Sequence, residues 1–216
     1  MAGGTRLTAI ATSEEGGRST KEDWLNHAIR ALVNHGIDEV KVQVIARELN
    51  VSRSSFYWFF ESLKDLHNQL LDHWLKINTG PMIERANRPA PTIIRAIINV
   101  FECWTDESLY DPKLDMAVRL WARRSDEVKA VVRLADSQRL EAVASMFRRH
   151  GYDEEDALIR ARVLYFTQVG HYVLEVDEDL ETRHGHVAAY LKSFSGQEPT
   201  EEDIEVSRRF TFRMQG

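Results

Sequence analysis

The sequence predicts an all-α protein with a small N-terminal helical domain and a larger helical domain behind it. Apolar residues recur three to four positions apart from Trp24 onward, which is the spacing that places them on one face of an α-helix. Capping residues, glycines and prolines divide these apolar segments at intervals typical of helices. No long segment alternates apolar and polar residues, as a half-buried β-strand would.

Length and composition limit the class of protein. A chain of 216 residues can bury a substantial core, in one domain or two. No apolar run reaches the roughly 18 residues that a membrane span needs, and the N-terminus lacks the apolar core of a signal peptide. We therefore expect a cytoplasmic protein with no membrane partner. The single cysteine, Cys103, excludes an intramolecular disulfide, and its neighbours Phe101 and Trp104 favour a buried apolar thiol.

The distribution of charge is more informative than its sum. The net charge of −6 argues mildly against a nucleic-acid-binding protein. Residues 41–64, however, carry more cations than acids, whereas acids dominate residues 175–205. An acidic rear half and a mildly basic front suit a protein that docks one end on DNA.

The N-terminal residues are expected to form an arm and then a helix. Residues 1–18 are small and polar, which predicts a disordered arm; its Arg6 and Arg18 can reach a phosphate or the minor groove, or the arm is simply a mobile tail. The first helix is expected to begin at Ser19, because Ser19 and Glu22 fit a capping box, and to end at Gly36.

Residues 42–66 contain two short helical patterns with a tight break between them. An apolar face runs from Val42 to Leu49, residues 50 and 51 interrupt it, and Ser52 is predicted to cap a second helix that begins at Arg53. Two helices joined by so short a turn form a helix-turn-helix unit, whose second helix enters the major groove in DNA-binding proteins.

The second of these helices offers a set of candidate DNA contacts. Phe56 follows the spacing of the core positions, so its neighbours are expected to be exposed. Exposed Tyr57 and Trp58 would have packing partners only in a groove of DNA. The alternative is that Tyr57, Trp58 and Phe59 are core aromatics. The predicted DNA-binding residues are Lys41, Val42, Arg53, Ser54, Ser55, Tyr57, Trp58 and Lys64.

Residues 24–66 resemble the DNA-binding domain of the TetR family of bacterial one-component regulators. The matching residues are Ala28, Leu32, Gly36, Ile37, Val42, Ile45, Ala46, Leu49, Asn50, Val51, Ser52, Phe56, Tyr57, Phe60 and Leu66. The resemblance implies a DNA-binding domain at residues 19–66 and a ligand-binding and dimerisation domain at 67–216. It also implies a ligand-responsive regulator, a repressor that a small apolar or amphipathic effector releases from a palindromic operator.

The sequence departs from the family after the aromatic residues. The family usually has a phosphate-gripping lysine where this chain has Leu63, and Lys64 follows one position later. Glu61 lies where it would repel the DNA backbone. A helical ligand-binding or scaffold protein that has lost DNA binding is therefore the alternative function.

The rear half is predicted to be helical throughout. Ser62 and Asp65 cap a helix over 63–78 that Gly80-Pro81 is expected to end, and a short piece follows over 82–86. Capping residues then predict further helices over 92–104, from 112 onward, and over 126–149, 153–176, 182–194 and 200–212.

No motif for catalysis, a cofactor or a metal is present. The sequence lacks a glycine-rich phosphate loop, a nucleophile elbow and a zinc-binding His-Glu-x-x-His, so no enzyme is predicted. His184, His186 and Glu181 could form a weak metal site, but their spacing favours the interpretation that they are solvated polar residues. The candidate pocket residues, each of which could instead be ordinary core, are Trp74, Cys103, Trp104, Met116, Leu120, Trp121, Phe166 and His171.

The mechanism predicts a homodimer. One short recognition helix buries too little surface for high specificity, and two copies about 34 Å apart read a palindrome in double-stranded DNA. The helix at 153–176 carries Ala157, Ala161 and Gly170, which permit close packing, so it is predicted to form a four-helix interface with one C-terminal helix. An effector of unknown identity would change DNA affinity through linkage.

Overall fold

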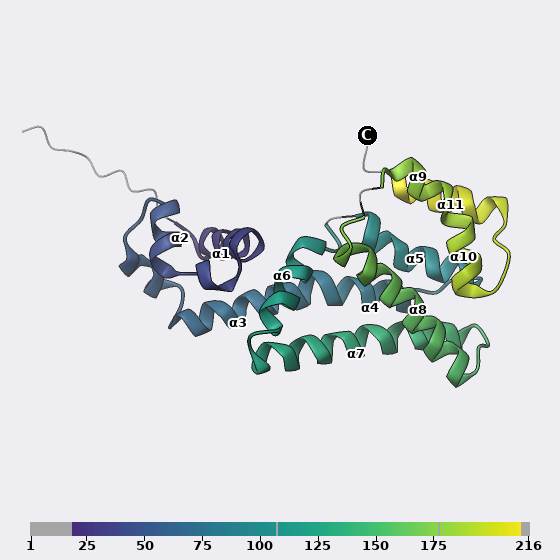
Figure 1. Ribbon diagram of the computed structural model, residues 1–216, viewed down its shortest axis with the longest axis horizontal. Helices are drawn as coiled ribbons and strands as arrows, with labels where there is room; N and C mark the ends of the chain where they lie inside the picture. The colour runs from purple at the N-terminus through teal and green to yellow at the C-terminus, as the bar shows by residue number, and fades with distance from the viewer. Residues whose placement is uncertain (1–18, 107, 177, 213–216) are drawn as a thin grey trace, which may run out of the picture.

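The computed structural model describes residues 19–106, 108–176 and 178–212. The predicted arm at 1–18, with Arg6 and Arg18, lies outside these residues. Across these ranges the chain forms eleven α-helices and no strand, so the predicted all-α class is confirmed. The molecule is elongated, with the N-terminal helices at one end and α5, α9, α10 and α11 gathered at the other (Figure 1).

The first helix, α1 (Lys21–His35), begins later than predicted. Thr20 is the N-cap, and the capping box joins Thr20 to Asp23 rather than Ser19 to Glu22. The Asp23 carboxylate accepts from the Thr20 backbone N–H at 2.8 Å, while the Ser19 hydroxyl accepts from the Trp24 indole at 3.2 Å. Gly36 ends the helix as predicted, with φ of +83°.

The helix-turn-helix is present, but its second helix is not an α-helix. A short 3₁₀ turn, η1 (Ile37–Glu39), precedes α2 (Val42–Glu48), and a second 3₁₀ helix, η2 (Arg53–Trp58), follows. Asn50 makes the turn at φ of +53°, a conformation that asparagine tolerates. The predicted side-chain cap from Ser52 is wrong, because its carbonyl, not its hydroxyl, accepts from the Ser55 N–H and hydroxyl.

The next predicted helix does not end at Gly80-Pro81. Ser62 caps α3 (Leu63–Trp74) as predicted, accepting from the Asp65 N–H at 3.1 Å. A π-helix, η3 (Leu75–Thr79), then leads directly into α4 (Gly80–Asn87). Pro81 has no N–H and its ring crowds the preceding turn, so a widened turn lets the helix continue past it.

The remaining helices follow the predicted caps with one exception. They are α5 (Ile93–Thr105), α6 (Pro112–Ala122), α7 (Asp126–Arg149), α8 (Glu154–Val173), α9 (Leu180–Gly185), α10 (Val187–Ser195) and α11 (Glu201–Phe212). The single helix predicted over 182–194 is two helices. Asp179 caps α9, accepting from the Thr182 N–H at 2.8 Å, and the chain turns at His186 before α10.

Two hydrophobic cores lie along the molecule, and buried polar groups separate them. The N-terminal core joins α1, α2, η2 and α3 to α6 and the first half of α7. The C-terminal core joins α4, α5 and α8 to the second half of α7. Arg139 of α7 and Asp115 of α6 are buried between them, with Nη1 of Arg139 3.1 Å from Oδ1 of Asp115. We call this Arg139–Asp115 pair, with Thr79 and Tyr165, the polar layer.

We expect His67 to make the stability of the N-terminal core sensitive to pH. It lies on α3, edge-on to Trp121 at 5.3 Å, and its buried Nε2 has no hydrogen bond among the described residues. Burial lowers the pKa of His67, and a hydrogen bond with the Val40 backbone only partly opposes this. The unfolded chain therefore binds more protons as the pH falls below the ordinary histidine pKa of about 6.5.

The free energy of unfolding is expected to fall as the pH drops from about 6.5 to the folded pKa of His67, and to fall less in His67→Gln. Urea unfolding at several pH values measures this. His35→Gln, at an exposed histidine of α1, is the matched control. Identical slopes in the native chain and His67→Gln would contradict the assignment to His67.

Candidate functional site

Two aromatic side chains project from η2 into solvent. Tyr57 is 65% exposed and Trp58 is 77% exposed, whereas Phe56 between Ser55 and Tyr57 is fully buried. Phe56 packs edge-on against Trp24 at 5.3 Å and stacks on Phe60 at 5.0 Å. This buried aromatic anchor fixes the orientation of η2 and leaves Tyr57 and Trp58 facing outward.

The other residues predicted on this surface divide into exposed and buried groups. Arg53 and Ser54 are exposed at the start of η2, and Lys41 is exposed 3.0 Å from Glu39. The prediction for Ser55 is wrong: it is 6% exposed, and its hydroxyl donates to the Ser52 carbonyl at 2.7 Å. Val42 packs partly buried against the N-terminal core.

Lys64 lies at the edge of this surface and is held by an acid. Its Nζ is 3.3 Å from Glu127 at the start of α7, and both side chains are largely exposed. An exposed ion pair is worth about 0–1 kcal/mol, so Lys64 can exchange Glu127 for another anion at little cost. Leu63 and Glu61 are also exposed, and Arg47, an exposed cation on α2, was missed by the predicted set.

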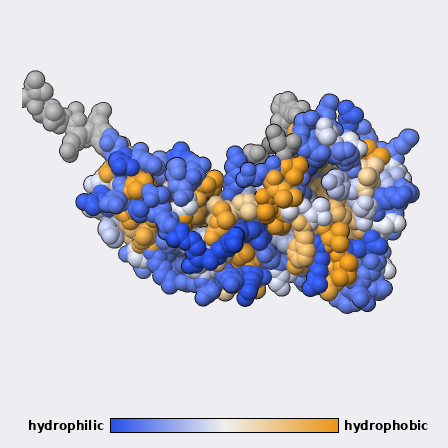
Figure 2. All heavy atoms as spheres, viewed as in Figure 1, coloured by the Kyte–Doolittle hydropathy of each residue, from blue (hydrophilic) through white to orange (hydrophobic). Residues whose placement is uncertain are grey.

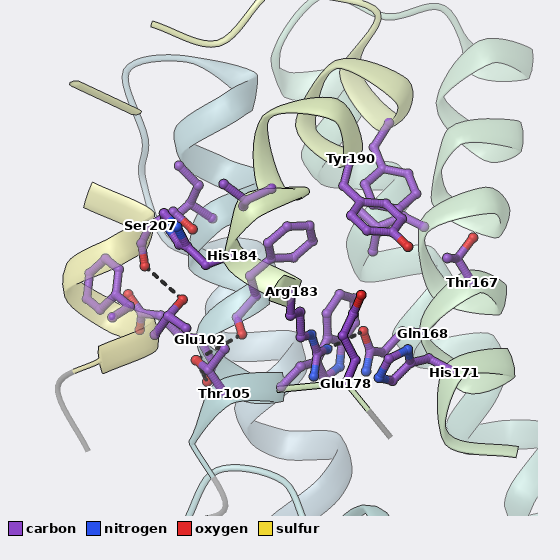
Figure 3. A pocket seen from close by; sticks show the side chains of 18 residues that line it. Glu102, Thr105, Thr167, Gln168, His171, Glu178, Arg183, His184, Tyr190 and Ser207 are labelled. Carbon is purple, nitrogen blue, oxygen red and sulfur yellow. Dashed lines mark hydrogen bonds between the residues drawn. The ribbon is translucent and has the colours of Figure 1, made fainter. Parts of the chain in front are cut away.

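A cavity lies at the opposite end of the molecule. It is enclosed by α5, α8, α9, α10 and α11 and has a volume of about 80 Å³. Aromatic side chains make much of its wall, among them Phe101, Trp104, Tyr190 and Phe194. Figure 3 shows Arg183, Gln168, His171 and Glu178 close together at one side of the cavity.

The predicted pocket residues are only partly brought together. Trp104 and His171 line this cavity. Met116, Leu120 and Trp121 instead line an open groove between α6 and the end of α1, which His171 also reaches.

Three predictions of pocket walls are corrected by packing. Trp74 is fully buried in the N-terminal core, where its indole donates to Asp115 at 2.8 Å. Cys103 is buried in the C-terminal core, and burial raises the pKa of its thiol to about 12. Phe166 points outward from α8 and is 55% exposed.

The polar side of the cavity combines the predicted His171 with side chains that the predicted set did not include, among them Gln168, Arg183 and His184. Nη2 of Arg183 donates to Oε1 of Gln168 at 3.3 Å. Burial, followed by the nearby charge of Arg183, lowers the pKa of His171, which favours its neutral form at pH 7. His184, interpreted from the sequence as a solvated residue, is partly buried, and its Nε2 has no hydrogen bond in the described structure.

Two further expectations concern what the protein lacks. Among the described residues, no group of three or more His, Cys, Asp or Glu side chains is placed to hold a metal ion. None of the helices in the described ranges is both long enough and apolar enough to cross a membrane.

Comparison with known proteins finds a family model that matches the N-terminal helices. Residues 25–70 match the family model described as "Bacterial regulatory proteins, tetR family". Curated protein sequences give no match.

Several solved structures share the fold over almost the whole chain. AmtR of Mycobacterium smegmatis aligns at 17% identity and a TM-score of 0.58, over 94% of this chain and 97% of its own. A transcriptional regulator from Rhodococcus sp. Rha1 aligns at 14% identity and a TM-score of 0.55, over 91% and 97%. GusR of Salmonella enterica aligns at 11% identity and a TM-score of 0.56, over 95% and 97%. Such low identities establish a common fold only.

Proposed function

We propose that this protein is a TetR-family regulator and a cytoplasmic repressor. Residues 25–70 match the TetR family model, and the chain shares its fold with transcriptional regulators of known structure. It binds a palindromic operator as a homodimer and is released by a small apolar or amphipathic effector. Residues 19–66 bind DNA, and residues 67–216 bind the effector and dimerise. The observation that most directly supports DNA binding is the exposure of Tyr57 and Trp58 on η2.

The exposed side of η2, with Arg53, Ser54, Tyr57 and Trp58, supports DNA as the partner, and we call it the reading surface. A Tyr and a Trp so exposed on a short helix have no packing role in the monomer. In a major groove the Tyr57 hydroxyl can donate to a phosphate, and Trp58 can pack against sugar or a thymine methyl. Arg53 and Ser54 lie at the start of the same helix, where they can reach a base edge or a phosphate.

The outer face of α8 supports the homodimer. Ile159, Val163 and Phe166 are exposed apolar residues three to four positions apart, so they form one stripe. Figure 2 shows hydrophobic side chains at the surface in the region of α8. Tyr190 extends the apolar surface on α10, which packs beside α8. Ala157 and Ala161 were predicted to pack against the partner helix, but both are buried in the C-terminal core.

A physical connection supports the effector response. The helix α8 lines the cavity through Leu164, Gln168 and His171. Its Tyr165 hydroxyl accepts from Nη1 of Arg139 at 3.0 Å, and Arg139 donates to Thr79 next to the start of α4. A ligand that prefers one position of α8 would therefore bias the spacing of the two DNA-binding domains, and DNA affinity changes by the same coupling energy.

The second candidate is a ligand-binding protein of the same fold that has lost DNA binding. It is favoured by Leu63 and Glu61, which weaken the phosphate contacts at the edge of the reading surface. An enzyme is not proposed.

Removing the exposed aromatics is expected to weaken operator binding about 10- to 100-fold for each of Tyr57→Ala and Trp58→Ala, since a good groove contact is worth about 1–3 kcal/mol. The DNA flanking the protein's own gene is the probe, at 50 and 200 mM salt. The native affinity is expected to fall steeply with salt, because phosphate contacts release counterions.

The matched control is Leu134→Ala, which removes an exposed apolar side chain of α7 away from η2 and is expected to keep native affinity. Absence of native binding at 50 mM salt would favour the ligand-binding alternative. If both aromatic variants bound the DNA with native affinity, η2 would not be part of the DNA interface.

A further inference from the structure

Arg183 is a cation at the cavity wall that has no ion pair among the described residues. Arg183 of α9 is partly buried at the cavity wall. Among the described residues it forms no ion pair, and its hydrogen bond to Gln168 is long, at 3.3 Å. A partly desolvated guanidinium without an anion is unfavourable, so this position is suited to a negatively charged ligand group.

The neighbouring amide presents a second donor. Gln168 of α8 is 9% exposed, and its buried Nε2 forms no hydrogen bond of normal geometry. The amide lies close enough to Tyr172 to oppose slightly the burial that raises the pKa of Tyr172 to about 12. Since Oε1 of Gln168 already accepts from Arg183, the two donor groups lie side by side (Figure 3).

Two acidic side chains, Glu102 and Glu178, line the cavity, and neither forms an ion pair with Arg183 in the described structure. The carboxylate of Glu102 accepts from Nε of Arg85 at 2.8 Å and from Nη1 of Arg88 at 3.1 Å. Glu178 lies 3.3 Å from Nδ1 of His186, a residue outside the cavity lining. Arg183 therefore shares this wall with the carboxylate of Glu178 but forms no ion pair with it among the described residues, so its guanidinium keeps donors for a ligand anion.

We propose that the effector is a hydrophobic carboxylic acid, bound through its carboxylate by Arg183 and Gln168. A guanidinium binds a carboxylate with two parallel hydrogen bonds, and one positive charge balances one carboxylate better than a doubly charged phosphate. The apolar part of the acid lies against Phe101, Trp104 and Tyr190, which give the cavity its aromatic wall. The identification as an effector rests on the proposed function; the binding itself does not.

The test compares acids with alcohols of the same skeleton. Titration calorimetry on the full chain compares decanoate with 1-decanol, and 4-phenylbutanoate with 4-phenylbutan-1-ol. At least one acid is expected to bind at least 10-fold more tightly than its alcohol. Arg183→Gln is expected to weaken that acid about 10- to 100-fold and to leave its alcohol unchanged.

The matched control is Arg133→Gln, at an exposed arginine of α7 that does not line the cavity, and it keeps native affinity. The comparison of acid with alcohol on the native chain does not depend on how the variant folds. Equal affinity for acid and alcohol, no binding of either acid, or native acid affinity in Arg183→Gln would each overturn the proposal.

Operator binding separates this inference from the proposed function. Acid binding that leaves operator affinity unchanged would support the carboxylate site and contradict its role as effector site. Operator binding by a protein that binds neither acid would overturn the carboxylate site and leave the regulator intact.

Discussion

Arg139→Ala is expected to lower the free energy of unfolding by about 3–5 kcal/mol, because it removes one of the two cations that balance a buried carboxylate. Arg139 is fully buried in the middle of α7. Its guanidinium contacts Asp115, Thr79 and Tyr165, and it lies over the Trp74 ring with 5.0 Å between Cζ and the ring centroid.

The electrostatic cause lies at Asp115. Burial alone would raise the pKa of this carboxyl, but Arg139 and Arg119 together hold it below its usual value. Asp115 is therefore ionised at pH 7, accepting from Arg119 at 2.7 Å and from Trp74 at 2.8 Å. Removing Arg139 takes away one of two cations from an acid that is 2% exposed.

Urea unfolding followed by circular dichroism measures this loss. Arg139→Met retains an apolar stem of similar length. It is expected to be destabilised nearly as much as Arg139→Ala, because the loss of the ion pair with Asp115 outweighs the loss of packing. Arg133→Ala, on the exposed side of the same helix, should stay within about 0.5 kcal/mol of the native chain. A loss below about 1 kcal/mol in Arg139→Ala would show that the polar layer contributes little to stability.

Phe166→Glu is expected to weaken the proposed homodimer more than 100-fold and to leave the monomer folded. The ring is 55% exposed on α8, so a carboxylate there remains hydrated in the monomer. In a symmetric interface through α8 the two new carboxylates would be buried near each other, and a desolvated unpaired charge costs several kcal/mol.

Sedimentation velocity over a range of concentrations measures the association, with circular dichroism as the check on folding. Leu134→Glu places the same charge on an exposed apolar position of α7, away from the proposed interface, and is expected to keep the native association. A Phe166→Glu chain that associates like the native chain would exclude this face of α8 as the interface.

The local elements were predictable because their signals are local. Asp111, Ser125 and Asp153 cap α6, α7 and α8 as the sequence predicted, since each side chain satisfies a backbone N–H only three residues away. The helix-turn-helix was also recognisable, because its apolar spacing and its family motif lie within one continuous segment. Burial of Phe56 beside exposed Tyr57 followed from the same spacing.

Local signals were insufficient where two interpretations differed by one residue or one turn. Thr20 and Asp23 satisfy each other better than Ser19 and Glu22 because Ser19 instead accepts from the Trp24 indole. Ser55 was predicted to face DNA on an α-helical register, but the 3₁₀ geometry of η2 turns its hydroxyl back to Ser52. Pro81 was predicted to end a helix that η3 allows to continue.

By itself, the sequence determined an all-α chain with a helix-turn-helix near its N-terminus, because helical periodicity, caps and the motif are properties of adjacent residues. Only the tertiary structure decided which residues share a cavity and which share a core. Arg183 and Gln168 come from separate helices, and Trp74 and Asp115 are 41 positions apart. Contacts between residues so far apart depend on how whole helices pack, and the spacing of residues along the chain does not predict that packing.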